Sequence, residues 1–123
     1  NRRISFELIR VIFEMRLMLT EGEGLELFRC LRCGKEEVHS VYLSEGGLIC
    51  RECAAKDKKL SKEYPIVLSA DAKYTLQYIL TSTPEKLYAF TVTDSVLDEL
   101  KRFMKSYLTR YLPHKFKTLD FIV

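Results

Sequence analysis

The sequence has few features of membrane-spanning, secreted or disordered chains. No apolar run reaches the roughly 18 residues that a membrane span needs. No signal peptide is visible, because Arg2 and Arg3 are followed by a patterned segment and not by an unbroken apolar stretch. Since the chain begins at Asn1, we expect its start to lie inside a longer protein. Its 123 residues are 47% hydrophobic and 30% charged, which excludes collagen-like and low-complexity classes and suits one domain or a small domain with an inserted lobe.

The sequence also lacks the usual signs of a catalytic site. It contains no recognisable Ser-His-Asp set, no paired acid and base carboxylates and no glycine-rich phosphate loop. Its two histidines, His39 and His114, stand apart from any other candidate catalytic or metal-binding side chain. We therefore expect a protein that is not an enzyme.

Four cysteines are the chemically informative residues. They form two C-x2-C pairs with 16 residues between them: Cys30, Cys33, Cys50 and Cys53. This spacing is typical of a zinc site, because two tight turns joined by a hairpin can place four thiolates about 2.3 Å from one ion. Gly34 follows the first pair, and Gly46 and Gly47 suit a hairpin turn before the second. The pattern predicts one structural Zn²⁺.

Three other interpretations of the cysteines are weaker. Two disulfides would suit a small secreted protein, but the chain has no secretory features. A redox site would use a single C-x-x-C motif near a βαβ unit, whereas this chain has two such motifs and neither lies in a βαβ pattern. A catalytic zinc would keep an open position and commonly use histidine or carboxylate ligands. A lobe spanning 25–59 is moreover too short for a stable core without a metal or another cross-link.

The remaining pattern is helical. Residues 4–19 predict a helix that is apolar nearly all round, with a narrow polar stripe of Glu7, Arg10 and Glu14, and such a helix is normally buried. Burying it requires more protein than this chain supplies, so we expect an exposed excess of apolar surface on it. Residues 61–93 predict helical structure interrupted by turns, including a helix over 69–82. A short helix is expected to begin at Pro84.

The last helix and a hairpin complete the predicted fold. Thr93 or Asp94 is expected to cap a long amphipathic helix that ends at Pro113. Residues 38–43 and 48–49 predict two paired strands. The fold class is therefore mainly α: a helical bundle with an inserted four-cysteine zinc-ribbon hairpin. The predicted helical domain comprises 1–24 and 60–123, and the zinc lobe comprises 25–59.

Charge is nearly balanced over the whole chain, at +3, and one Zn²⁺ held by four thiolates would lower it to about +1. Bulk charge therefore does not indicate nucleic-acid binding. Residues 101–123 nevertheless carry six basic side chains and one acidic one: Lys101, Arg102, Lys105, Arg110, Lys115 and Lys117 against Asp120. These cations form either a solvated face or a surface for phosphates or an acidic peptide. Tyr107 and Tyr111 could stack on bases, but their helical spacing favours the core.

Four segments, taken in order, resemble the C-terminal part of the RecO family. Phe13 to Met18 resembles the family's F-E-x-R-L-L helix, and Cys30 to Gly34 its C-x2-C-G turn. Gly46 to Cys53 resembles its G-G-h-h-C-x-x-C segment, where h is apolar. Tyr107 to Phe121 resembles its closing Y-L-x-x-h-L-x-x-x-x-K-S-L-x-F pattern. The order and gaps extend over nearly the whole chain, and the two flanking helical signatures make the resemblance specific.

The resemblance implies a cytoplasmic, nucleoid-associated DNA repair protein of bacteria. RecO proteins bind single- and double-stranded DNA, anneal complementary strands and pair with RecR. They load the RecA recombinase onto strands coated by single-stranded DNA-binding protein, whose acidic, apolar C-terminal tail docks on the helical domain. The family's N-terminal OB-fold would be absent from this chain. We expect the tail near Arg16 and the basic residues of 101–117. The alternative is a zinc-stapled module that binds only protein.

Overall fold

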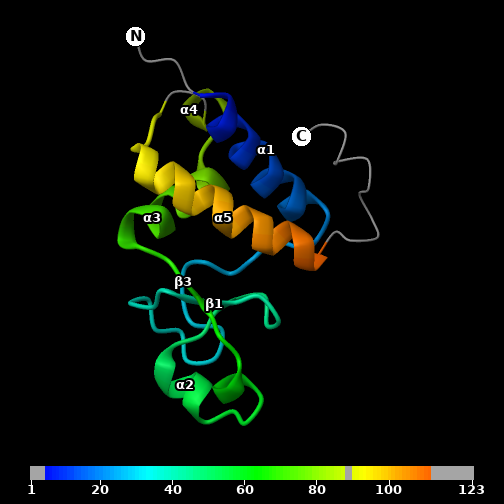
Figure 1. The fold of residues 1–123 in the computed structure, drawn as a ribbon, viewed down its shortest axis with the longest axis vertical. Coiled ribbons are helices and arrows are strands. Elements are labelled where there is room, and N and C mark those ends of the chain that lie inside the picture. Colours follow the sequence, from blue (N-terminus) through cyan, green and yellow to red (C-terminus); the bar gives the residue numbers. More distant parts are fainter. Residues whose placement is uncertain (1–4, 88–89, 112–123) are drawn as a thin grey trace.

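The computed structural model describes residues 5–87 and 90–111 of the chain. Figure 1 shows an elongated molecule with the long helices gathered at one end and a smaller lobe at the other. The mainly helical fold with a small inserted cysteine lobe is confirmed. The elements in chain order are α1 (Phe6–Thr20), β1 (Ser40–Tyr42), β2 (Gly47–Leu48), α2 (Arg51–Ala55), the 3₁₀ turn η1 (Leu60–Lys62), β3 (Ile66–Val67), α3 (Ala70–Thr81), α4 (Pro84–Leu87) and α5 (Asp94–Tyr111).

Helix α1 packs against α3 and α5 and supplies the centre of the helical core. The Ser5 side chain caps it by accepting a hydrogen bond from the Leu8 N–H at 3.1 Å. At its C-terminal end the chain turns through Gly22, whose φ of 83° lies in the left-handed region. Ile12 and Met18, on the inner face, are fully buried.

The distribution of polar and apolar side chains around α1 differs in part from the prediction. Glu14, assigned to the polar stripe, is only 6% exposed and accepts a 3.0 Å hydrogen bond from Arg10 Nε. Phe6 and Phe13 are instead 72% and 48% exposed. The exposed rings are the apolar excess expected of this helix, because α3 and α5 cover only part of α1, whereas the assignment of Glu14 to an exposed polar stripe is wrong. The predicted first residue of this helix, Ile4, lies outside the described residues.

Helices α3 and α5 begin as their sequences predict. Ser69 Oγ accepts from the Ala72 N–H at 3.1 Å, and Thr93 Oγ1 accepts from the Val96 N–H at 3.3 Å. The inward side chains of α5 recur at helical spacing and fill the bundle. They are Val96, Leu100, Phe103, Met104 and Tyr107.

The lobe is built on a three-stranded antiparallel sheet of order β2-β1-β3. Val41 at its centre faces Leu48 on β2 and Ile66 on β3. The β1–β2 hairpin is the one expected, whereas β3 falls in a stretch predicted to be helical. That prediction is wrong at β3. Two residues are too few to show the alternation typical of a strand, and their extended conformation depends on pairing with the edge of β1.

Four long side chains connect the lobe to the helices. Each comes from α3 or α5 and donates to a backbone carbonyl in the segment 23–43 that leads into and through the lobe. The side chain of Lys73 is buried although it is charged, and its ammonium lies 2.8 Å from a carbonyl oxygen. The donor and acceptor pairs are Lys73 to Glu36, Gln77 to Leu27, Tyr107 to Glu23 and Tyr111 to Leu43.

Candidate metal centre and basic surfaces

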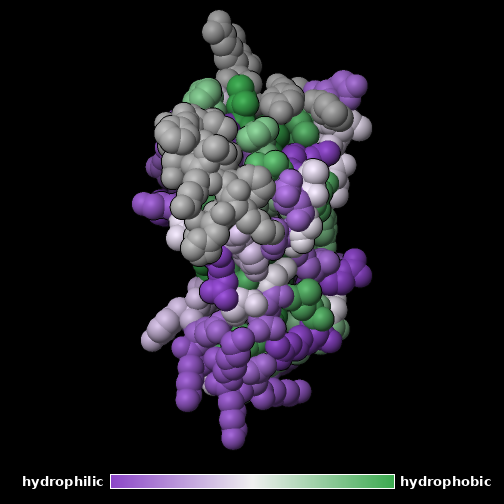
Figure 2. All heavy atoms as spheres, turned by 90° about the vertical axis from the view of Figure 1, so that its right-hand side faces the viewer, coloured by the Kyte–Doolittle hydropathy of each residue, from purple (hydrophilic) through white to green (hydrophobic). Residues whose placement is uncertain are grey.

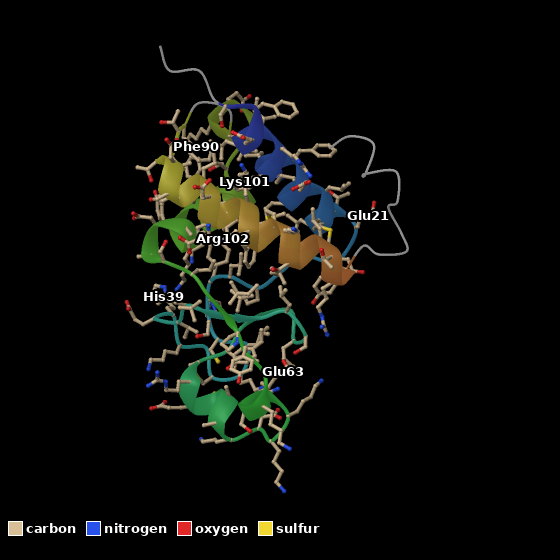
Figure 3. All side chains as sticks on the ribbon, viewed as in Figure 1. Glu21, His39, Glu63, Phe90, Lys101 and Arg102 are labelled. Atoms are coloured by element: carbon tan, nitrogen blue, oxygen red, sulfur yellow. The ribbon has the colours of Figure 1, made fainter. Side chains whose placement is uncertain are left out.

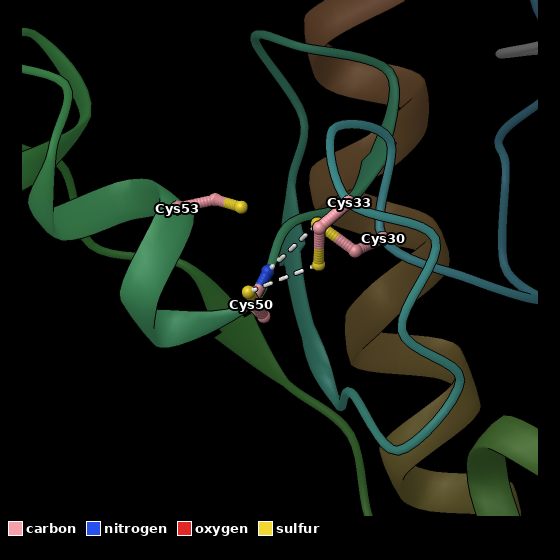
Figure 4. Close-up of side chains that lie close together, drawn as sticks. All are labelled: Cys30, Cys33, Cys50 and Cys53. Carbon is pink, nitrogen blue, oxygen red and sulfur yellow. Dashed lines mark hydrogen bonds between the residues drawn. The ribbon is translucent and has the colours of Figure 1, made fainter.

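The lobe brings the four cysteines together from two turns. Cys30 and Cys33 lie on the turn that precedes β1, Cys50 is the N-cap residue of α2, and Cys53 lies inside α2. Their sulfur atoms all lie within 4.8 Å of one another, and Cys33 Sγ and Cys50 Sγ are 3.7 Å apart. Figure 4 shows the two pairs converging on one small space.

This geometry fits a shared metal ion. A tetrahedral shell with bonds of about 2.3 Å places its sulfurs about 3.8 Å apart, whereas a disulfide would join two sulfurs at about 2.05 Å. All four cysteines are free, so the disulfide interpretation does not fit. Among residues 5–87 and 90–111, no histidine or carboxylate joins this group, and no other group of three or more such side chains could hold a metal. The donor set is four sulfurs, which suits zinc or iron.

The four thiols lie close enough to perturb one another's ionisation. Burial would raise the pKa of Cys30, but hydrogen bonds from the backbone of Cys33, Cys50 and Arg32 outweigh it and lower that pKa to about 6. Hydrogen bonding with the Cys50 thiol, aided by burial, raises the pKa of Cys53 to about 12. Four thiolates this close together repel one another unless a cation lies between them. A bound divalent ion would allow all four to be deprotonated.

Glycines and backbone hydrogen bonds hold the two turns in place. Gly34 has a φ of 80° and donates to the Cys30 carbonyl at 3.0 Å, which closes the first turn. Leu31 then donates to Leu48 at 2.8 Å and joins this turn to β2. In the hairpin Gly46 has a φ of 85°, as its predicted turn role requires.

The basic residues of α5 divide into two groups. Lys101 forms an ion pair with Glu7 of α1 at 3.4 Å, and Arg102 next to it is exposed (Figure 3). Lys105 and Arg110 line a groove of about 680 Å³ together with Ser106, Thr109, Tyr111 and, from the hairpin turn, Leu43. The predicted Lys115 and Lys117 lie outside the described residues.

The groove contains one residue that the sequence did not indicate. Leu43 comes from the lobe, 62 or more positions away from the α5 residues that it faces, and no local pattern marks it. Tyr111 forms part of the wall and donates its hydroxyl hydrogen to the Leu43 carbonyl, which joins α5 to the hairpin turn. Burial raises the pKa of the Tyr111 hydroxyl, so the neutral donor is favoured.

Two other candidates have structural surroundings. Arg16 is half-buried on α1, and its Nη1 donates to the carbonyls of Ile79 and Ser82 at 3.1 and 3.2 Å. It therefore closes the C-terminal end of α3 and does not line the α5 groove. Tyr107 has no exposed surface, which confirms its expected place in the core and leaves it unavailable for stacking.

Comparison with known proteins agrees with this architecture. The family described as "Recombination protein O C terminal" matches residues 5–120. A DNA repair protein RecO of Acetivibrio thermocellus is 34% identical over 122 residues, which cover 98% of this chain and 46% of that protein. One from Desulforamulus reducens is 29% identical over 119 residues, covering 94% and 44%. The chain thus spans less than half the length of these relatives, and no solved structure matches it. No helix in the described part of the chain combines the length and apolarity that crossing a membrane requires.

Proposed function

The chain belongs to the RecO family, as its C-terminal region, and on that basis we propose that it is a non-catalytic module for DNA repair and recombination. It binds DNA and protein partners, and it supports strand annealing and the loading of RecA onto strands coated by single-stranded DNA-binding protein. It acts with RecR and with an N-terminal OB-fold, in the bacterial cytoplasm at the nucleoid.

In this proposal the four cysteines hold one structural Zn²⁺. The sulfur positions support it, because they match a closed four-thiolate shell with no ligand position left for substrate. The ion fastens the zinc lobe, and the lobe extends past the boundary of 59 expected from the sequence, because β3 pairs with β1 in its sheet. The helices α1, α3, α4 and α5 form the helical domain. When bound, the ion supplies a cross-link that a lobe of this size requires.

The observation that carries the proposed role in partner binding is the groove beside α5. Its walls combine the apolar surfaces of Leu43 and Tyr111 with the cations of Lys105 and Arg110. An acidic peptide with apolar residues at its C-terminal end requires this combination: a pocket for the apolar side chains and positive charge at the rim. We therefore assign the groove to the C-terminal tail of single-stranded DNA-binding protein.

The exposed face of α1 supports the proposed contact with the OB-fold. Phe6 and Phe13 lie seven residues apart on one side of the helix, and both rings are largely exposed. The relatives are about twice as long as this chain, so another part of such a protein can cover these rings.

The test of the groove uses an acidic peptide that ends in apolar residues and a free carboxylate. We expect Lys105→Ala/Arg110→Ala to weaken its binding by about threefold to tenfold, because both cations are exposed and an exposed ion pair contributes up to about 1 kcal/mol. Fluorescence anisotropy measures the affinity. Lys101→Ala/Arg102→Ala removes the same charge from the same helix outside the groove and should leave the affinity within about twofold.

Equal weakening by both variants would show that the peptide responds only to the net charge of α5, and would remove the groove from the proposal. The alternative function, a module that binds only protein, predicts normal peptide binding together with no affinity for single-stranded DNA at low salt.

A further inference from the structure

The end of the lobe farthest from the helices carries a cluster of lysines. Lys56, Lys58, Lys59 and Lys62 fall within the seven residues 56–62, which follow α2 and include η1, and all four are exposed. The same seven residues contain one acid, Asp57. Figure 2 shows this end of the molecule as predominantly hydrophilic, with long side chains projecting from it. We call residues 56–64 the lobe tip.

The acids near the lobe tip are engaged inside the lobe. Asp57 Oδ2 accepts from Arg32 Nη1 at 2.8 Å, and that hydrogen bond lowers the pKa of Asp57. Its Oδ1 accepts from the backbone of Lys59 and Leu60. Glu63 accepts a 2.7 Å hydrogen bond from Ser44 Oγ. The carboxylates thus fix the shape of the segment and do not neutralise most of its lysines.

The lysines themselves are nearly free of ion pairs. In the described part of the chain, Lys56, Lys58 and Lys62 make none, and Lys59 approaches Glu45 only at 3.8 Å. That carboxylate already accepts from Arg32 at 3.1 Å. The positive charge of the lobe tip is therefore available to a ligand outside the protein.

Three of these ammonium groups are arranged by one ordered turn. The Lys62 N–H donates to the Lys59 carbonyl at 3.3 Å, and the Glu63 N–H donates to the Leu60 carbonyl at 3.0 Å, which are the bonds of a 3₁₀ turn and place residues three apart on the same side. Lys59 and Lys62 are related in this way, and Lys58 directly precedes Lys59. Leu60, inside this turn, is fully buried and anchors it. Because the backbone that carries these lysines is already ordered, only their side chains lose freedom when they bind a polyanion.

An exposed aromatic ring completes the surface. Tyr64 follows Lys62 by two residues and is 98% exposed, more than any other large hydrophobic side chain described. Cations bind phosphates, and a free ring stacks on the flat face of a base. In a duplex the base faces are covered by their neighbours, whereas a single strand offers phosphates and base faces together.

We propose that the lobe tip, through Lys56, Lys58, Lys59, Lys62 and Tyr64, is a binding surface for single-stranded DNA. The proposal rests on the proposed role in DNA repair and adds a site on the opposite end of the molecule from Phe6 and Phe13, apart from the α5 groove. An acidic protein would also attract the lysines, but it supplies no planar face for Tyr64.

The first test compares two surfaces with equal changes in charge. The 123-residue chain is titrated with a labelled oligothymidylate over a series of salt concentrations. Lys58→Ala/Lys59→Ala/Lys62→Ala should flatten the log–log salt slope by up to about 2, at roughly 0.7 per lost phosphate contact. Lys86→Ala/Lys101→Ala/Arg102→Ala is the matched control, because it removes three exposed cations of the helices that line neither the α5 groove nor the lobe tip, and it should leave the slope unchanged. Circular dichroism and metal content verify that both variants fold.

The second test separates stacking from charge. Tyr64→Ala should weaken binding at least about fivefold at constant salt without changing the slope, and Tyr64→Phe should retain the parent affinity because its ring stacks equally well. The position is exposed, so neither substitution disturbs the core.

The outcomes distinguish this proposal from the one on which it rests. If the parent chain binds the oligonucleotide and the lobe-tip variants bind equally well, the lobe tip is not the site and the role in repair stands. If the parent chain shows no affinity at low salt, direct DNA binding by this chain fails and the lobe tip fails with it. A duplex bound as tightly as the single strand, with no effect of Tyr64→Ala, would overturn the assignment to single strands.

Discussion

At the scale of single residues, Gly47 is a position where the lobe has no room for a side chain. Its Cα lies so close to the segment before the first cysteine pair that an added Cβ would stand 2.5 Å from the Glu26 carbonyl oxygen and 2.9 Å from Glu26 Cβ. The same two segments are hydrogen-bonded, since the Leu48 N–H donates to the Glu26 carbonyl at 3.0 Å. A methyl group here must therefore separate two backbones that hold the cysteine turns together.

We predict that Gly47→Ala lowers the free energy of unfolding by about 1–3 kcal/mol, the usual cost of an overpacked site. Chemical denaturation followed by circular dichroism measures the change. Gly24→Ala is the matched control, because its Cβ would meet the movable end of the Leu19 side chain at 2.8 Å. A smaller effect at Gly47 than at Gly24 would contradict the close contact with Glu26.

The sequence indicates some of these residue roles and not others. Cys30, Cys33 and Gly34 predict a metal-binding turn, because metal ligation requires thiolates at the first two positions and the left-handed backbone conformation favours glycine at the third. The contact between Gly47 and Glu26 joins residues 21 positions apart, and no spacing rule relates them. Glu14 shows the same limit, because its burial depends on which neighbours cover α1.

At the scale of elements, an arginine side chain of one helix caps the C-terminal end of another helix. The last carbonyls of a helix have no partner inside it, and Arg16 from α1 donates to two carbonyls at the end of α3. Because the donor is charged and half-buried, these hydrogen bonds should stabilise the bundle more than an ordinary surface contact would.

We predict that Arg16→Met, which keeps the apolar stem but removes the guanidinium, lowers the free energy of unfolding by about 1.5–3 kcal/mol. Denaturation detected by far-ultraviolet circular dichroism measures it. Arg102→Met removes an exposed guanidinium from α5 and should change stability by no more than about 0.5 kcal/mol. If Arg16→Met instead left stability unchanged but weakened peptide binding, its proposed place in the partner site would be favoured over this structural role.

Elements were predictable in proportion to their length. The apolar period of α5 extends over five turns, and the sequence offers Thr93 and Asp94 as its cap, of which the structure uses the Thr93 hydroxyl. Strand β3 has two residues, and its conformation depends on β1, which lies 24 or more positions earlier. The exposure of Phe6 and Phe13 depends likewise on how far α3 and α5 extend around α1.

At the scale of the whole molecule, the sequence predicted a lobe inserted in a bundle but not the junction between them. The junction consists of hydrogen bonds from side chains of α3 and α5 to backbone carbonyls. Because every residue has a backbone carbonyl, the sequence does not indicate which of them will accept. Gln77 and Lys73 lie on α3 four residues apart and reach opposite sides of the first cysteine turn, at Leu27 and Glu36. The position of the lobe on the bundle therefore depends on the fold of the cysteine turn.

This dependence leads to a prediction for the whole chain. Cys50→Ser should abolish stoichiometric metal binding and unfold the lobe, because a structural zinc site contributes about 10–16 kcal/mol, more than a small lobe gains from its own core. Helix α5 should remain helical, since it packs against α1 and α3 independently of the cysteines. Its stability should fall, however, because Lys73 and Tyr111 lose ordered carbonyl acceptors. Elemental analysis, circular dichroism and limited proteolysis follow the three effects.

The matched control is Ser61→Ala, an exposed change in the same lobe that leaves all four sulfurs in place. It should retain metal and resist proteolysis as the parent chain does. After Cys50→Ser, cleavage is expected first between 25 and 68, and α5 should survive as a resistant helical fragment with its partners. Stoichiometric metal in Cys50→Ser would mean that Cys50 is not a ligand. Metal loss with an intact lobe would mean that the sheet and the junction hold it without the ion.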